Sequence, residues 1–208
     1  MPPRADMRFV VAIDGPSAAG KGTIAKTVSD RFGFAYLDTG LLYRAVGART
    51  LFGDDPAKAA EQLDTDALNA SNLRSAEVAN AASKVAAIPQ VRAALFDFQK
   101  RFAQRAGGAV LDGRDIGTVV CPDARHKLFV TASMEVRAER RVKELQDRGL
   151  RAIYARVFED MKERDARDIE RAVSPLEPAK DANTLDTSDL DADQVFQAAL
   201  DLIGSPGK

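Results

Sequence analysis

Cysteine is nearly absent from this sequence, and neither sign of charge is in excess. Among 208 residues there is one cysteine, Cys121, which excludes an intrachain disulfide and a cysteine-rich zinc site. The 30 lysines and arginines offset 31 aspartates and glutamates, which leaves a formal net charge of −1. This balance excludes a broadly basic nucleic-acid coat and an acidic disordered tail, so we expect no nucleic-acid partner.

Long apolar runs are absent as well. No stretch of 18 apolar residues occurs, so we expect no membrane-spanning segment and no membrane partner. The first residues, MPPRADMRFVVAID, have neither a long apolar region nor a small-residue cleavage site, which argues against secretion. Together with the lone cysteine, these features favour a cytoplasmic location.

What the sequence does contain is an alternation of short apolar segments with longer helical patterns. The short segments have the length and composition of buried strands, and they lie at residues 9–14, 35–38, 109–112, 127–131 and 183–186. The helical patterns cover residues 21–32, 41–51, 75–87, 89–104, 133–149, 150–172 and 192–203, with Thr39 and Ser133 expected as caps. Such alternation predicts an α/β fold in which a parallel sheet is flanked by helices on both faces.

A glycine-rich stretch connects the first expected strand to the first expected helix, and its residues are Gly15, Pro16, Ser17, Ala18, Ala19, Gly20, Lys21, Gly22 and Thr23. Small residues let backbone N–H groups point at an anion, and the helix adds its positive N-terminal end. Lys21 supplies a charge for the β- and γ-phosphates. In this strand–loop–helix context the pattern is a Walker A motif and predicts a nucleoside triphosphate as ligand. The plainer alternative is a glycine-rich turn whose lysine reaches water.

The loop lacks one expected magnesium ligand. Gly22 stands where the simple motif has a serine or threonine hydroxyl. We therefore expect Mg²⁺ to be held by phosphates, water and a remote carboxylate. Asp112 ends a short strand, and the carboxyl ends of parallel strands face the ligand crevice, so we assign the metal to Asp112. A turn-forming aspartate before Gly113 is the alternative.

Five segments, taken together and in this order, resemble the bacterial-type cytidylate kinases: GPSAAGKGT, YLDTGLLYR, EVANAASKVAAIPQVR, LDGRDIGTVV and KERDARDIERAVSPL. The resemblance runs from about Phe9 to Ile203. It implies a P-loop NTPase core with a short monophosphate-binding insert and a mobile, arginine-rich helical lid. It also implies that ATP, with Mg²⁺, phosphorylates CMP or dCMP in pyrimidine nucleotide metabolism.

The same resemblance sets the expected organisation. We expect a single domain over residues 1–208, acting as a monomer, with the monophosphate-binding region at about 39–106 and the lid at about 148–172. Members of the family often carry a β-rich insert before the EVANAAS segment. Here residues 54–74 are short and show no strand alternation, so we expect no extra β-sheet.

Phosphorylating a monophosphate requires a second phosphate dianion in line with the γ-phosphate of ATP, and arginines clamp such groups. By resemblance, Arg44, Arg92 and Arg114 surround the phosphate and base of CMP, with Thr39 and Tyr43 beside the acceptor. Taken alone, Arg44 or Arg92 could equally belong to a solvated face, and Arg114 could form a surface turn pair with Asp115.

The base requires a polar reader, because cytosine presents an amino donor that uracil lacks. Asp115 is suited to accept from that amino group, and Ser83 can add a hydroxyl. The resemblance places both residues at the pyrimidine. A helix-packing serine and a surface turn aspartate are the alternatives.

Arginines are dense in the expected lid. Arg164, Arg167 and Arg171 are spaced i, i+3 and i+7 and share one helical face with Asp168. By resemblance, Arg164 and Arg171 contact phosphate or CMP, Asp168 lies near the sugar or the arginines, and Arg167 assists the transferred group. With Lys21, these three arginines are our catalytic set, stabilising charge on the moving phosphoryl group. A salt-bridged exposed helix is the alternative.

Two other functions remain possible from the residues alone. A nucleotide-dependent switch that reads guanine would normally carry Asn-Lys-x-Asp, and no asparagine here precedes a lysine. A kinase of another small metabolite would use the same loop, but the arginine-rich acceptor side favours an anionic acceptor.

Overall fold

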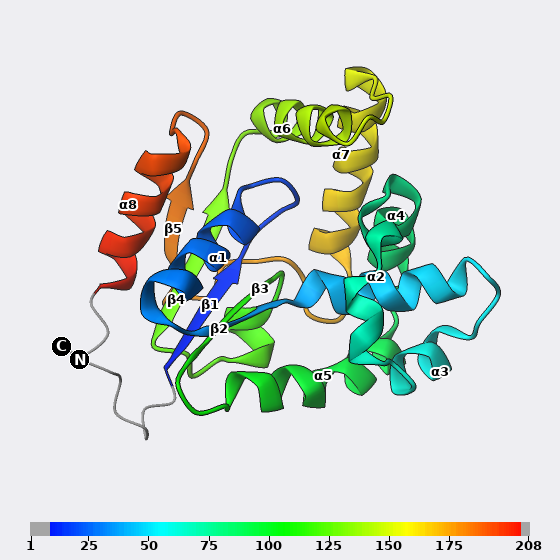
Figure 1. The fold of residues 1–208 in the computed structure, drawn as a ribbon, viewed down its shortest axis with the longest axis horizontal. Coiled ribbons are helices and arrows are strands. Elements are labelled where there is room, and N and C mark those ends of the chain that lie inside the picture. The colour runs from blue at the N-terminus through cyan, green and yellow to red at the C-terminus, as the bar shows by residue number, and fades with distance from the viewer. Residues whose placement is uncertain (1–8, 205–208) are drawn as a thin grey trace.

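The computed structural model describes residues 9–204, and its centre is a five-stranded parallel sheet. The strands lie in the order β2-β3-β1-β4-β5 (Figure 1). Their bounds are β1 Val10–Asp14, β2 Ala35–Asp38, β3 Ala109–Gly113, β4 His126–Thr131 and β5 Asn183–Asp186. All five predicted strands are confirmed, each to within one residue at either end.

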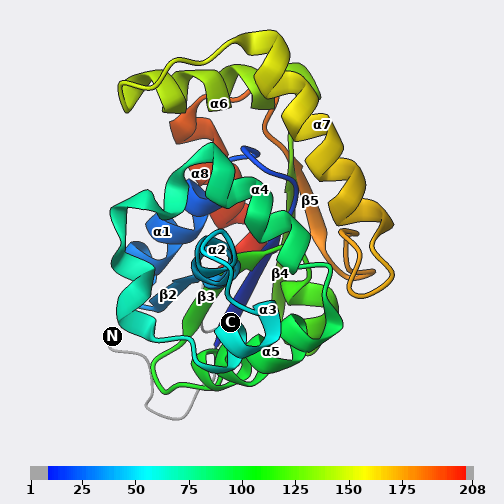
Figure 2. The ribbon, with the colours of Figure 1, turned by 90° about the vertical axis from the view of Figure 1, so that its right-hand side faces the viewer.

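Helices cover both faces of the sheet (Figures 1 and 2). Their bounds are α1 Lys21–Phe32, α2 Thr39–Thr50, α3 Pro56–Glu61, α4 Ala76–Val85, α5 Pro89–Ala103, α6 Met134–Asp147, α7 Tyr154–Glu170 and α8 Ala192–Ile203. Short 3₁₀ turns at Thr65–Asn69 and Ser71–Arg74 and a π turn at Ile116–Val120 complete the connections. The predicted α/β architecture is therefore correct.

Strand periodicity divides the core into two layers. In β1, Val11 and Ile13 pack with α1 and α8, whereas Ala12 faces the opposite layer with α2 and α5. Successive side chains of a strand point to opposite faces, so both faces of a sheet covered on two sides must be apolar. This explains the unbroken apolar run in β1 and places the polar residues at the strand ends.

Helices α6 and α7 pack against each other and extend beyond the carboxyl ends of the strands (Figures 1 and 2). A separate small apolar cluster holds them together, with Ala138 and Leu145 from α6 and Val157 and Met161 from α7. Ser133 caps α6 as predicted, because its hydroxyl accepts from the backbone N–H of Val136 at 3.3 Å.

Two local expectations were wrong. Thr39 is not a cap: Asp38 takes that position, and the Thr39 hydroxyl donates to the Asp112 carbonyl at 2.7 Å. The α7 helix begins at Tyr154, later than the pattern indicates.

Residues 54–74 contain α3 and the two 3₁₀ turns, in keeping with the expectation of no extra sheet. Between residues 9 and 204, no helix is long and apolar enough to cross a membrane.

Candidate active site

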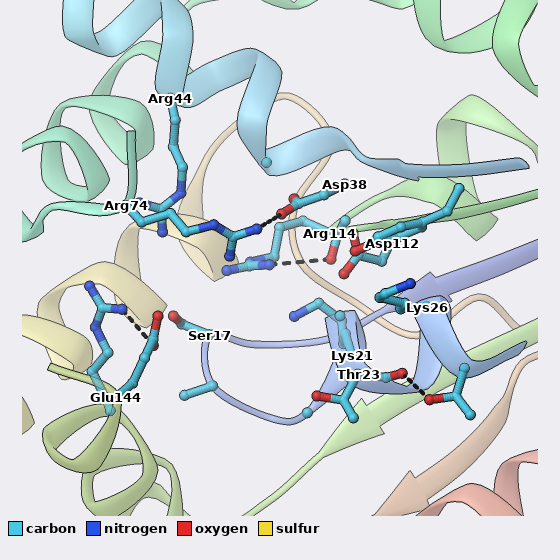
Figure 3. Close-up of a pocket in the computed structure, with 18 of the residues that line it drawn as sticks. Ser17, Lys21, Thr23, Lys26, Asp38, Arg44, Arg74, Asp112, Arg114 and Glu144 are labelled. Atoms are coloured by element: carbon cyan, nitrogen blue, oxygen red, sulfur yellow. Dashed lines mark hydrogen bonds and ion pairs between the residues drawn. The ribbon is translucent and has the colours of Figure 1, made fainter. Parts of the chain in front are cut away.

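The carboxyl ends of the three strands β1, β2 and β3 bring their terminal aspartates to one edge of the sheet. Asp38 lies opposite Asp112 in the β2–β3 register, and Asp14 lies opposite Gly113 in the β1–β3 register. A cavity of about 600 Å³ opens over this edge, between the glycine-rich loop and a group of arginines (Figure 3). Ligands of open parallel sheets bind at such an edge.

The loop between β1 and α1 requires glycine at its first position. Gly15 has φ 143°, and a Cβ there would lie 1.9 Å from the Val130 carbonyl oxygen. Ala18 and Gly20 also have positive φ, at 59° and 94°, so the loop backbone turns sharply around the space before α1. This conformation directs main-chain N–H groups inward, as an anion cradle requires.

Lys21 is buried at the start of α1. Its Nζ donates to the Pro16 carbonyl at 2.7 Å, which holds the side chain over the loop. Burial, and then the positive charge of Arg114, lower the pKa of Lys21 below its ordinary value. A phosphate placed in the loop would supply the negative charge that this ammonium group lacks.

Asp112 is the predicted metal ligand, and its environment fits that role. Burial, and then the neighbouring carboxylate of Asp38, raise the pKa of Asp112, and its Oδ1 has no hydrogen-bond partner in the described part of the chain. A cation would relieve both the repulsion and the unpaired oxygen. Within residues 9–204 no group of three or more His, Cys, Asp or Glu side chains could hold a metal. Mg²⁺ commonly binds one or two carboxylates and takes its other ligands from phosphates and water, so a single carboxylate at Asp112 could hold it.

Asp115 and Arg92 form a buried ion pair at the opposite end of the site. The Arg92 guanidinium lies 5.5 Å from the ring centroid of Tyr43, and Nη2 of Arg171 lies 3.8 Å from Asp115 Oδ1. Thr39 and Ser83 line the same small cavity, of about 50 Å³. In this arrangement the two arginines can bind an anion, and the carboxylate between them can accept a hydrogen bond from a polar base edge.

Asp168 connects three elements that are distant in the sequence. Its Oδ2 accepts from Arg114 Nε at 2.8 Å and lies 3.9 Å from Arg164 Nε, and its Oδ1 accepts from Ser83 Oγ at 3.4 Å. Burial acts to raise the pKa of Asp168, but the positive charges of Arg114 and Arg164 outweigh it and hold the pKa below its ordinary value. The carboxylate therefore stays ionised and fixes the arginines in place.

The predicted lid arginines do not all reach the cavity in the same way. Nε of Arg164 and Nη2 of Arg171 are buried without a hydrogen-bond partner among the described residues. Both atoms are therefore available to donate to a bound anion. Arg167 instead donates to Ser83 Oγ at 3.3 Å and to Asn80 Oδ1 at 2.9 Å on α4. Its part in the transferred group's charge stays a prediction.

Sequence reasoning missed several residues of this site. Asp14 accepts the backbone N–H groups of Ile116 and Gly117, both at 2.7 Å, and so fixes the turn that follows Asp115. Asp38 and Arg74 face each other in the larger cavity, 3.6 Å apart. Nothing local marks these residues, because their partners lie far away in the sequence.

Two further contacts fix the loop and the α6–α7 pair. Arg137 donates to Asp165 at 2.5 Å and to the Ser17 carbonyl at 3.3 Å, and thus connects α6, α7 and the glycine-rich loop. Arg44 donates to the Leu73 carbonyl at 2.8 Å and lines the larger cavity. Most of the predicted site residues line one of two adjoining cavities, whereas Arg167 lines neither.

A strand–loop–helix phosphate cradle at the edge of a parallel sheet, with a buried lysine and opposing arginines, defines the class of P-loop kinases. Among solved structures, an uncharacterized protein from Eubacterium ventriosum superposes with TM-score 0.58 at 14% identity, covering 95% of this chain and 99% of that one. A gluconokinase from Sinorhizobium meliloti superposes with TM-score 0.54 at 14% identity, covering 94% and 91%. At these identities the likeness concerns the fold alone.

Sequence comparison identifies the family. The profile described as cytidylate kinase matches residues 11–64 and 56–205. A cytidylate kinase from Paramagnetospirillum magneticum is 63% identical over 209 residues, covering 96% of this chain and 99% of that protein. One from Cereibacter sphaeroides (strain KD131) is 59% identical over 197 residues, covering 95% and 96%. The chain belongs to the cytidylate kinase family, and it is a kinase.

Proposed function

We propose that the protein transfers the γ-phosphoryl group of ATP to CMP or dCMP. The observation that carries the proposal is the shared wall of the two cavities. Gly113, Arg114 and Arg164 line both the larger cavity over the glycine-rich loop and the smaller one beside Asp115. Two nucleotides bound in these cavities would meet at Arg114 and Arg164, phosphate to phosphate.

The reaction then follows from the placement of charge. An oxygen of the CMP phosphate forms a bond to the γ-phosphorus, the bond from that phosphorus to the β–γ bridging oxygen breaks, and ADP leaves. Lys21 neutralises the donor phosphates, while Arg114 and Arg164 face the group in transit. Positioning and charge carry this step, so no general base is required of the chain.

Magnesium fits the donor side. Asp112 would hold it, together with phosphate oxygens and water, and the ion would neutralise charge on the β- and γ-phosphates. Gly22 of the loop lies next to Asp112: a Cβ there would lie 3.7 Å from Asp112 Oδ2, at ordinary contact distance. Gly22 itself offers no hydroxyl for the metal.

Base recognition is proposed for the smaller cavity. Cytosine presents an amino donor, and the Asp115 carboxylate is an acceptor held in place by Arg92. Ser83 adds a hydroxyl, which donates to Asp168 Oδ1 at 3.4 Å, and we assign Asp168 to the sugar. A base that leaves these buried groups unpaired would be rejected.

A third cavity, of about 270 Å³, adjoins the loop on the α1–α8 side and suits the purine of ATP. Gly20 and Thr23 line it, with Arg140 and the apolar side chains of Val195 and Phe196. Arg140 donates to Thr187 Oγ1 at 2.9 Å, which fixes its guanidinium at the rim.

We propose that the lid covers about residues 148–172 and that the monophosphate-binding region covers about residues 39–106. That the protein is a monomer and lies in the cytoplasm stays a prediction.

An acceptor panel tests the proposal. The initial rates with ATP and Mg²⁺ are measured on CMP, dCMP, UMP, AMP and GMP, and CMP or dCMP is expected to be the best acceptor. Equal or faster rates on AMP or GMP would refute the cytosine assignment. Lys21→Ala is expected to abolish turnover, whereas the matched control Lys58→Ala, at an exposed position of α3, is expected to retain the wild-type rate. A Lys21→Ala variant with a near-normal rate would remove the loop from the mechanism.

A further inference from the structure

Arg74 projects into the larger cavity from the short turn that precedes α4. Its guanidinium lies beside Asp38, on the side of the cavity that also holds Arg44 and Arg114, and across from Lys21 of the glycine-rich loop (Figure 3). Its position therefore belongs to the acceptor side of the site rather than to the loop that cradles the donor phosphates.

The donor groups of Arg74 are unused. Its one ion pair, from Nη2 to Asp38 Oδ2, spans 3.6 Å, which is too long for a hydrogen bond. Its side chain makes no hydrogen bond with any residue between 9 and 204, and it is half exposed, at 51%. Arg74 is held only loosely beside a carboxylate, and it faces a cavity that is also lined by Lys21, Arg44 and Arg114. Its guanidinium can therefore bind an incoming anion.

The backbone beneath Arg74 is fixed on both sides. Leu73 is buried against Ala45 and Val78, and the Ser75 hydroxyl accepts from the Val78 backbone N–H at 3.2 Å to start α4. Because the backbone is already fixed, only the rotamer freedom of the Arg74 side chain is lost when it binds a ligand. Arg74 is thus placed by packing, not by its own polar contacts.

The same turn also orients a second arginine. The Leu73 carbonyl accepts from Arg44 Nη1 at 2.8 Å. Leu73 directly precedes Arg74, so the same short turn positions both arginines. Burial, then nearby cations that include Arg74, lower the pKa of Arg44 to about 10 although Asp38 opposes this. Two adjacent cations repel each other until an anion lies between them.

We propose that Arg74 binds the 5′-phosphate of the acceptor nucleoside monophosphate together with Arg44, exchanging its loose contact with Asp38 for the phosphate. A bidentate guanidinium–phosphate contact is the geometry for which arginine is suited. The inference deepens the proposed function, since it names a further residue of the acceptor site.

Steady-state kinetics of Arg74→Gln test it. Loss of a charge-assisted contact with a phosphate is expected to raise KM for CMP about 10-fold to 100-fold while KM for ATP stays within about twofold. Arg74→Lys, which keeps the charge but not the fork, is expected to lie between the two. Arg49→Gln is the matched control: Arg49 pairs with Asp54 at 2.6 Å outside the cavity, and both KM values are expected to be unchanged.

Inhibition by cytidine separates phosphate binding from a structural role. Cytidine lacks the phosphate, so its inhibition constant is expected to be the same in wild type and Arg74→Gln. A KM for CMP within about twofold of wild type in the folded variant overturns the proposal, as does an equal rise in the cytidine constant. If the wild type prefers another monophosphate, the proposed function fails, and the same comparison with that monophosphate and its nucleoside still decides the role of Arg74.

Discussion

Replacing Asp115 by leucine removes the carboxylate from a buried pair of arginines. The Asp115 and Arg92 side chains are only 6% and 9% exposed, and Arg171 Nη2 lies 3.8 Å from the other carboxylate oxygen. Asp115→Leu leaves two guanidinium groups facing an apolar side chain, away from water. Breaking a buried pair by removing one partner costs about 3–5 kcal/mol, and the second arginine places this variant at the upper end.

Replacing the partner, Arg92, is expected to cost less stability. Arg92→Met leaves Asp115 with Arg171 as a remaining partner, so we expect a loss of about 3 kcal/mol. The double variant Arg92→Met/Asp115→Leu replaces the pair by apolar groups. We expect its loss in the free energy of unfolding to be smaller than the sum of the two single losses by at least about 2 kcal/mol. This coupling energy measures the interaction between the two buried side chains.

Urea unfolding followed by circular dichroism measures the three free energies of unfolding. Lys26→Met is the control, because Lys26 and Asp30 form an exposed pair, at 67% and 63% exposure, whose loss changes stability by at most about 0.5 kcal/mol. Losses that simply add in the double variant would refute a coupled pair. A loss below about 1 kcal/mol for Asp115→Leu would refute the burial argument.

Two further predictions concern the start of the glycine-rich loop. Gly15→Ala places a Cβ 1.9 Å from the Val130 carbonyl oxygen, so it is expected to lower the free energy of unfolding by at least about 2 kcal/mol and to abolish ATP binding. Gly53→Ala, at φ 96° with open space around the new Cβ, is the control that shows the cost of backbone strain alone. Equal losses of stability in the two variants would contradict the clash. Burial raises the pKa of Asp14 from 3.8 to about 6, so the folded protein holds a proton that the unfolded chain releases, and this contribution to stability is lost as pH rises between those values. Relative to Asp14→Asn, the wild-type free energy of unfolding is therefore expected to fall by about 2 kcal/mol between about pH 4 and about pH 6.5, and a difference independent of pH would contradict it.

Most of the fold was predictable because its signals are local. The apolar run of β1 follows from burial on both faces, and the Ser133 cap of α6 follows from a side chain three residues before the N–H it accepts. Errors occurred where a distant partner overrides a local preference. Thr39 has the chemistry of a cap, but its hydroxyl donates to a carbonyl on β3 instead, and Asp38 occupies the cap position.

The phosphate cradle at residues 15–23 was determined by the sequence alone, because its glycines, lysine and helix start are contiguous and act through their own backbone. The family resemblance predicted which residues form the acceptor site, and the structure shows how their side chains are arranged. Only the tertiary structure decided that Asp168 joins Arg114 and Ser83, which lie 54 and 85 residues away, and that Asp14 fixes the turn 102 residues further on. Such contacts depend on the register of the strands and the packing of α4 against α7, and these properties arise only when the whole chain is folded.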